Sequence, residues 1–292
     1  MLTPTLIVVA IIAVWPLIQV VYQSLTDARF NSPTPTSFVG LRNYSDLLKD
    51  IAFRDSVWIA VKFAIVTVIF EFILGLIVAL VVNSNFRGRG LTRAAMLIPW
   101  AVITVVSAQM WKFMFNQTSG VVNDLLYFRI GGLINTFLPA SHHILTGNGQ
   151  AWLAQNSTSF WSVCAVDIWK TTPFVALLLL AGLQVIPGDV YEAARVDGAA
   201  AVQAFFRITL PLLRPAILVV LIFRTLDSLR VFDVFYVLEG TNPTTQTMAI
   251  YNYSNLVSFG DYGYGSTISV AIFIIIALFV IAYVTFLKVE TT

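Results

Sequence analysis

Residues 268–284 read Ile-Ser-Val-Ala-Ile-Phe-Ile-Ile-Ile-Ala-Leu-Phe-Val-Ile-Ala-Tyr-Val, without one charged side chain. A helix that crosses the hydrocarbon of a bilayer needs about 20 mostly apolar residues. This run and its flanks therefore predict a membrane-spanning helix at 266–288. The same criterion predicts five more spans, at 2–25, 56–83, 93–115, 158–186 and 212–238. We expect an all-α polytopic membrane protein with six transmembrane helices in a single domain, 1–292.

The composition excludes several classes of protein. The chain is 58% hydrophobic and 11% charged, whereas a soluble domain is about 45–50% apolar and about 25% charged. A soluble enzyme is therefore excluded, and a net charge of +2 is too small for a nucleic-acid binder. With a single cysteine, Cys164, no internal disulfide is possible. We expect no catalytic residue, no metal site and no cofactor in this chain.

The distribution of basic residues predicts the orientation, because Lys and Arg are enriched in cytoplasmic connections. The connections at 84–93, 187–214 and 288–292 hold seven Lys or Arg in 43 positions. The other set holds five in 99 positions, at 26–55, 116–157 and 239–265. The first set is therefore predicted to face the cytoplasm. Both termini are then cytoplasmic, in the inner (cytoplasmic) membrane.

The cytoplasmic connection 187–211, named the elbow below, has a pattern of its own. It reads Pro-Gly-Asp-Val-Tyr-Glu-Ala-Ala-Arg-Val-Asp-Gly-Ala-Ala-Ala-Val-Gln-Ala-Phe-Phe-Arg-Ile-Thr-Leu-Pro. Asp189 and Glu192 suit the positive N-terminal end of a helix, and Gly198 ends it because glycine reaches positive φ at little cost. The alanines after it begin a second short helix. The pattern predicts a helix–turn–helix outside the bilayer, although an amphipathic pair lying on lipid headgroups is also compatible with it.

The elbow resembles the coupling motif of binding-protein-dependent ABC importer permeases. That motif has E-A-A, three residues, G, and a hydrophobic run that ends in L-P. The chain supplies it with Glu192, Ala193, Ala194, Gly198, Ile208, Leu210 and Pro211, and Asp197 matches the carbohydrate-uptake version. The resemblance implies that the elbow lies in a cleft on a separate ATPase subunit. Glu192 would be the polar contact, Gly198 the turn beside Asp197, and Ala193 and Ala194 the close-packed surface.

Other segments resemble the same family across nearly the whole chain. They include Phe38, Gly40, Leu41, Asn43 and Tyr44 after the first span, and Gly120, Val122, Asn123 and Leu126 after the third. The segments Phe223-Arg-Thr-Leu-Asp and Arg230-Val-Phe-Asp-Val-Phe-Tyr-Val-Leu most resemble permeases of the trehalose and maltose branch. The resemblance implies import of a sugar, such as one of these disaccharides, by alternating access.

The partner proteins are predicted from a nucleotide-binding motif that the chain lacks and from the resemblance to the permease family. No G-x-x-x-x-G-K-[ST] phosphate loop occurs in the sequence, so another chain must supply the ATPase. The resemblance implies two ATP-binding cassette subunits that bind ATP and Mg, and an extracytoplasmic sugar-binding protein. It also implies a second permease subunit, either a homologous different chain or a second copy of this one. Membrane lipid surrounds the bundle.

Several ionisable residues lie inside the expected spans. A central charge costs about 2.5–3.5 kcal/mol on insertion, so these side chains must face protein or water. In the span at 212–238 they recur every third residue with alternating sign, so that neighbours can pair. One interpretation is a self-neutralised ladder; the other is a polar wall of the sugar pathway formed by Asp227, Arg230 and Asp233, with the Tyr236 ring beside them. The whole set is Lys62, Glu71, Lys112, Asp167, Lys170, Arg224, Asp227, Arg230 and Asp233.

Glu71 is the most isolated member of this set, and we expect it to have a partner on another helix. A different interpretation of the chain is an ion-coupled secondary sugar transporter, with Glu71 or Asp227 as the proton carrier. An intramembrane enzyme is a third. It would need a nucleophile–base or metal constellation in the spans, and the sequence offers none.

Overall fold

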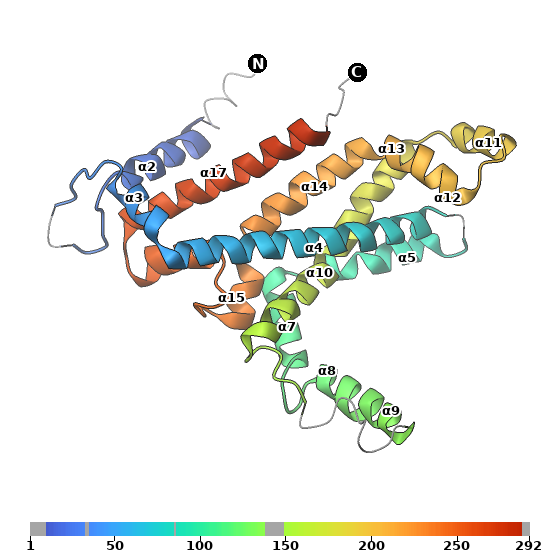
Figure 1. Cartoon of the computed structure of the whole chain (residues 1–292), viewed down its shortest axis with the longest axis horizontal. Helices are drawn as coiled ribbons and strands as arrows, with labels where there is room; N and C mark the ends of the chain where they lie inside the picture. Colours follow the sequence, from blue (N-terminus) through green and yellow to red (C-terminus); the bar gives the residue numbers. More distant parts are fainter. Residues whose placement is uncertain (1–9, 33–34, 85, 138–148, 288–292) are drawn as a thin grey trace. The chain divides into compact units, whose positions relative to one another are not determined.

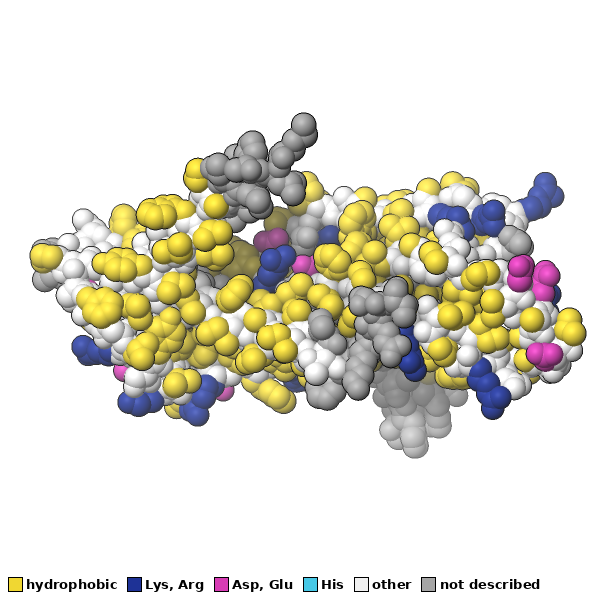
Figure 2. Space-filling view, turned by 90° about the horizontal axis from the view of Figure 1, so that it is seen from above, with side chains coloured by type: hydrophobic (Ala, Val, Ile, Leu, Met, Phe, Trp, Pro, Cys, Tyr) yellow, Lys and Arg dark blue, Asp and Glu magenta, His cyan; other side chains and the backbone are white. Residues whose placement is uncertain are grey.

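The computed structural model describes residues 10–32, 35–84, 86–137 and 149–287 (Figure 1). These residues are largely helical, and within them β structure is limited to two isolated bridges. Three described helices are long and apolar enough to cross a membrane: α4 (Ile51–Asn83), α10 (Asn156–Val185) and α17 (Tyr262–Leu287). They coincide with the spans expected at 56–83, 158–186 and 266–288. Hydrophobic side chains cover much of the face in Figure 2, which suits a lipid environment.

The span expected at 93–115 is not a single helix but a pair, Arg89–Ala101 and Thr104–Met114, bent by 87°. A second bend, of 65°, separates Ala201–Leu212 from Arg214–Glu239, at the boundary expected between the elbow and the span at 212–238. Within that span, residues 230–232 interrupt the helix. Pro99 lies in the last turn before the first bend, where it has no N–H to donate, and the backbone at Val102 is extended. Of the span expected at 2–25, η1 (Ala10–Val14) and α2 (Trp15–Ser24) are described and helical; residues 1–9 lie outside the described part.

The chain divides into two compact units. Unit 1 comprises Met1–Lys62, Leu229–Phe232 and Thr241–Ala282. Unit 2 comprises Phe63–Ser228, Asp233–Gly240 and Tyr283–Thr292.

In unit 1, side chains of the segment around Asn43 secure the end of α2. The Asn43 amide donates to the carbonyl oxygens of Ser24 (3.0 Å) and Thr26 (2.8 Å). The Tyr44 hydroxyl lies 2.7 Å from the Ser24 hydroxyl. Gly40 has φ +58°, which allows the chain to turn into α3 (Arg42–Lys49). The last carbonyls of a helix have no partner within it, so the Asn43 amide caps the C-terminal end of α2.

Asp50 joins three elements of unit 1. Its Oδ1 accepts from the backbone N–H groups of Ala52 (2.9 Å) and Phe53 (3.3 Å), which makes it the N-cap of α4. Its Oδ2 accepts from the hydroxyls of Tyr251, on α16 (Met248–Tyr253), and Tyr264. Burial alone would raise the pKa of Asp50, but the tyrosine and backbone hydrogen bonds outweigh it and hold the pKa below its ordinary value.

In unit 2, α4, α10 and α14 (Arg214–Leu229) form a buried apolar core of Ala79, Val82, Val175, Leu179, Leu180, Leu183, Leu213 and Val220. Two glycines permit the close approach of these helices. A Cβ at Gly75 of α4 would lie 2.6 Å from a Val175 methyl group of α10, and one at Gly182 would lie 2.5 Å from the Cβ of Ala216. Small residues let helix backbones approach in membrane bundles. This packing places the polar side chains described next.

Candidate functional site

The elbow is a helix–turn–helix, as the sequence predicts. Its first arm is α11 (Gly188–Val196), and the second arm is α12 (Ala201–Ala204) continued by η4 (Phe205–Thr209) and α13 (Leu210–Leu212) (Figure 1). Gly198 has φ +77°. Its N–H donates to the carbonyl of Arg195 (3.1 Å), and the N–H of Ala199 donates to that of Ala194 (2.9 Å). This pair of bonds is a Schellman motif, which favours glycine at the left-handed position.

Most of the residues that the resemblance singles out lie on the surface of the elbow. The side chains of Glu192 and Arg195 are each 73% exposed and lie 3.8 Å apart. Ala193, Asp197 and Gly198 are also exposed. The surface around them is apolar for an exposed turn, because Val196 and Val202 are 87% and 69% exposed. The arrangement therefore offers a small-residue, partly apolar surface with the acidic side chains of Glu192 and Asp197.

A groove of about 440 Å³ lies beside this surface. Ala194 faces it from the first arm, and Phe205 from the second. The hydroxyls of Tyr191 and Thr209, 3.0 Å apart, join the two arms and line the groove. The turn motif at Gly198 and this contact help to hold the shape of the elbow, and both arms have exposed polar and apolar side chains.

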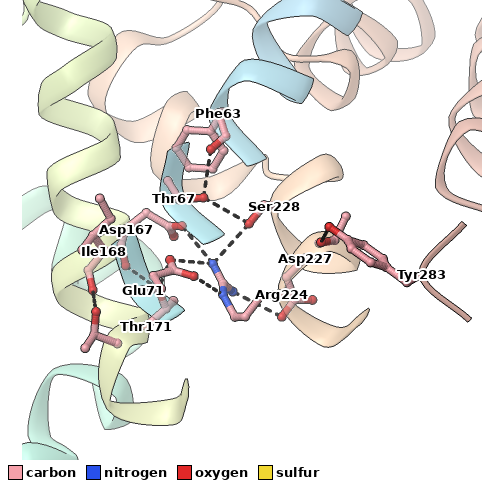
Figure 3. Close-up of polar contacts among 12 residues, drawn as sticks. Phe63, Thr67, Glu71, Asp167, Ile168, Thr171, Arg224, Asp227, Ser228 and Tyr283 are labelled. Carbon is pink, nitrogen blue, oxygen red and sulfur yellow. Dashed lines mark hydrogen bonds and ion pairs between the residues drawn. The ribbon is translucent and has the colours of Figure 1, made fainter. Parts of the chain in front are cut away.

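A buried ion-pair network lies between the three core helices of unit 2 (Figure 3). The Arg224 guanidinium of α14 donates to Glu71 of α4 through Nε (2.5 Å) and Nη2 (2.9 Å). It also donates to the Asp167 carboxylate of α10 (3.0 Å). Arg224 and Glu71 are 4% and 0% exposed. The Thr171 hydroxyl donates to Glu71 as well. The expectation that Glu71 has a partner on another helix is confirmed.

The alternating ladder expected along 212–238 is wrong as a continuous series. α14 ends at Leu229, and Asp233 begins α15 (Asp233–Glu239), so the four charges do not share one helix. Arg224 does pair with Asp227 (3.6 Å), as the spacing predicts, but its shorter contacts are to α4 and α10. Asp167 pairs with Arg224 rather than with Lys170. The contact of Arg224 with Glu71 is bidentate, and bidentate guanidinium–carboxylate contacts are stronger than single ones.

The helix is interrupted at residues 230–232, between α14 and α15. A hydrogen bond within unit 1 satisfies a backbone carbonyl of this break. The Thr247 hydroxyl donates to the carbonyl oxygen of Val231 (2.8 Å). In a continuous helix this carbonyl would accept from the residue four positions later. Breaks in membrane helices are tolerated where side chains satisfy the freed backbone groups. Asp233 then starts α15 with an acid at its positive end.

The four expected substrate-pathway residues have different surroundings. The Asp227 side chain is 49% exposed, although it pairs with the buried Arg224. Tyr236 is 38% exposed, on α15. Arg230 lies in the break between α14 and α15 and belongs to unit 1, whereas the other three belong to unit 2.

Sequence reasoning missed Thr171 and Ser228 as members of the network. Ser228 accepts from Arg224 (3.3 Å) and lies 3.4 Å from the hydroxyl of Thr67. The signal was present, because Thr171 follows Asp167 by four positions and Ser228 follows Arg224 by four, the spacing that brings helical side chains together. The described residues hold no group of three His, Cys, Asp or Glu side chains that could bind a metal ion.

Comparisons with known proteins identify the class to which this arrangement belongs. A family model described as "Binding-protein-dependent transport system inner membrane component" matches residues 71–289. The trehalose/maltose transport system permease protein MalF of Thermococcus litoralis is 43% identical over 288 residues, 97% of this chain and 90% of that protein. The sulfoquinovosyl glycerol transport system permease protein SmoG of Agrobacterium fabrum is 38% identical over 275 residues, 94% of this chain and 84% of that protein.

A solved structure shares the fold. It is a bacterial alginate ABC transporter in complex with an alginate pentasaccharide-bound periplasmic protein, and one of its chains is 22% identical with a TM-score of 0.82. The likeness covers 99% of this chain and 92% of that one. The chain belongs to the family of binding-protein-dependent transport system inner membrane components. It is an ABC transporter permease, a transport component and not an enzyme in its own right.

Proposed function

We propose that this chain is the membrane-spanning subunit of an ATP-driven importer of a disaccharide such as trehalose or maltose. The 43% identity to a trehalose/maltose permease over 97% of the chain supports this substrate class. The polar side chains and the exposed Tyr236 ring of the last helices suit a sugar, whose hydroxyl groups need many hydrogen bonds. Asp227, Arg230, Asp233 and Tyr236 are the proposed substrate-pathway residues.

The proposed topology has six spans in one transmembrane domain, 1–292. Three long helices, the bent pair Arg89–Ala101 and Thr104–Met114, the segment Arg214–Glu239 and the apolar helix Ala10–Ser24 together supply that number. The distribution of Lys and Arg supports a cytoplasmic position for the elbow and for both termini. The inner membrane of the cell is the proposed location.

The elbow is proposed as the contact with the motor of the transporter. Two ATP-binding cassette subunits bind ATP and Mg, and one of them holds the elbow in a cleft. A second, homologous permease completes the pathway, and an extracytoplasmic binding protein delivers the sugar. The observation that carries this proposal is the exposed turn at Gly198, flanked by the exposed Glu192, Ala193 and Asp197, in the spacing of the family's coupling motif.

The test is transport by the complete complex in proteoliposomes, with ATP hydrolysis measured in parallel. Glu192→Lys reverses the charge of the proposed contact, and Gly198→Asp places a side chain at φ +77°. Both variants are expected to separate ATP hydrolysis from uptake. Gly188→Ala is the matched control, because a Cβ there meets no atom within 4 Å. Wild-type uptake and receptor-stimulated hydrolysis in the first two variants would rule out the assigned role of the elbow.

A further inference from the structure

A basic turn, residues 86–93, follows the end of the apolar helix α4. It contains Arg87, Arg89 and Arg93 within seven positions, and no acidic residue occurs between 84 and 98. Arg87 and Arg89 are exposed. Figure 2 shows several Lys and Arg side chains at its right-hand end, where Figure 1 draws α5 (Arg89–Met96) and the elbow of unit 2. The turn itself thus carries three positive charges and no negative one.

Arg93 fixes the basic turn against the end of α4. Its Nη2 donates to the carbonyl oxygen of Val82 (3.1 Å), one of the last carbonyls of that helix. The Nε of Arg93 is buried and has no hydrogen-bond partner in the described part of the chain. The start of α5 lacks a side-chain cap as well, because its N-cap is Gly88, with φ +89°. Free N–H donors in an arginine-rich segment favour an anionic ligand.

The same part of unit 2 has exposed apolar side chains. Leu91 of the basic turn is 78% exposed, and Ile98, just beyond α5, is 63% exposed. The turn joins two segments that are apolar enough to cross a membrane, α4 and the bent pair Arg89–Ala101 and Thr104–Met114, so it lies at a bilayer surface. Arginines beside apolar side chains are typical of segments at the boundary between headgroups and acyl chains. A phospholipid matches both parts of the turn, since it has a phosphate for the arginines and acyl chains for Leu91.

We propose that the basic turn binds the headgroup of an anionic phospholipid in the cytoplasmic leaflet. The guanidinium groups of Arg87 and Arg89 donate to the phosphate oxygens, which they can do in bidentate fashion, and Leu91 contacts the acyl chains. A zwitterionic headgroup has the same phosphate, but its own ammonium group offsets the attraction. Each arginine is expected to favour the anionic lipid about fivefold, the equivalent of about 1 kcal/mol. This inference rests on the proposed topology, which assigns the turn to the cytoplasmic side, and adds a lipid site to it.

A fluorescent probe attached to Leu91→Cys measures which lipid lies beside the turn. Cys164 is buried and does not take up the probe. The complete complex, with the exposed cysteines of its other subunits removed, is reconstituted at low ionic strength in phosphatidylcholine bilayers with an increasing fraction of a spin-labelled quencher lipid. Spin-labelled phosphatidylglycerol is expected to reach half-maximal quenching at a mole fraction about fivefold or more below that of spin-labelled phosphatidylcholine. Molar sodium chloride is expected to remove this preference in the unaltered turn, because salt screens exposed charges.

The arginines are tested in the same assay. Arg87→Gln combined with Arg89→Gln is expected to abolish the preference for phosphatidylglycerol, whereas Arg87→Lys combined with Arg89→Lys keeps the charges and is expected to retain most of it. Arg129→Gln is the matched control, because Arg129 is also exposed, 74%, but lies in a segment expected on the opposite side of the membrane. Its preference is expected to equal that of the wild type.

Three results overturn the proposal. The first is equal quenching by the two lipids with the arginines in place, and the second is quenching by neither, which would show that a protein subunit covers the turn. The third is loss of the preference in millimolar inorganic phosphate at constant ionic strength, which would assign the site to a free anion. Quenching is measured without transport, so a complex that imports neither trehalose nor maltose refutes the proposed function alone, and an active complex without lipid preference refutes only the lipid site.

Discussion

Arg224 and Glu71 lie 153 positions apart in the sequence and form the shortest ion pair of the described residues, with Nε 2.5 Å from the carboxylate. Both side chains are inaccessible to solvent or nearly so. Asp167 provides a second carboxylate at 3.0 Å. One guanidinium thus joins α4, α10 and α14. A proton carrier must exchange protons with water, and the complete burial of Glu71 does not suit that role, in agreement with membership of an ATP-driven family.

Removal of one partner of this network is expected to destabilise unit 2. Arg224→Met leaves Glu71 and Asp167 without their cation, and breaking a buried ion pair costs about 3–5 kcal/mol. Chemical unfolding of the purified complex in detergent measures the loss. Asp227→Asn is the control, because its carboxylate is half-exposed and its pair with Arg224 is longer, 3.6 Å. Equal stabilities of wild type and Arg224→Met would contradict the role of the network.

Gly75→Ala is expected to disturb the packing of α4 on α10. The added Cβ would lie 2.6 Å from a Val175 methyl group and 3.2 Å from the backbone nitrogen of Ala176, so the helices must separate. Overpacking of this kind costs about 1–3 kcal/mol. Thermal unfolding gives the measurement, with Gly90→Ala as a control because nothing lies within 4 Å of its Cβ position. A Gly75→Ala protein as stable as Gly90→Ala would show that the helices yield without cost.

Thr247→Val is expected to destabilise the non-helical segment between α14 and α15. The substitution leaves the half-buried Val231 carbonyl without its donor and α16 without its N-cap side chain, at nearly constant side-chain volume. Loss of such a cap costs about 0.5–2 kcal/mol. Hydrogen exchange in residues 229–239 is expected to accelerate. Thr247→Ser keeps the hydroxyl and is expected to exchange at the wild-type rate; a difference between Ser and wild type as large as that for Val would assign the effect to the lost methyl group instead.

Asp50 gives unit 1 a predicted dependence on acid. Its folded-state pKa lies below the unfolded value of about 3.9, because the hydrogen bonds from Tyr251, Tyr264 and the start of α4 outweigh burial. The unfolded state therefore binds the proton first, and the contribution of Asp50 to stability is present above about pH 4 and is lost as the pH falls through the folded value. Unfolding free energies measured between pH 6 and pH 3 check this.

Asp50→Asn retains a cap and is expected to flatten this pH dependence. Tyr264→Phe removes one hydrogen-bond donor to Asp50 and is expected to reduce the slope of the unfolding free energy against pH. At the alkaline end, burial and then the hydrogen bond to Asp50 raise the pKa of Tyr251 to about 12. Tyr251 therefore stabilises the fold below about pH 10. This stabilisation is lost as the pH rises towards 12. A wild-type slope in Asp50→Asn would assign the acid dependence to other groups.

The sequence predicted the helices whose apolar runs are uninterrupted, and it predicted the turn at Gly198 from local chemistry. It failed at the ladder, because the periodicity of one helix carries no information about hydrogen bonds from other parts of the chain. The carbonyl of Val231 is satisfied by Thr247, 16 positions later. Arg224 likewise takes partners 57 and 153 positions away in preference to its helical neighbours. Packing at Gly75 allows α4 and α10, which carry those partners, to approach closely.

The elbow leaves α10 at Val185 and enters α14 at Arg214, and those two helices approach closely where Gly182 meets Ala216. The two ends of the elbow are therefore held side by side. If the elbow is the contact with the ATPase, as proposed, a displacement at Gly198 would reach α10 and α14 together.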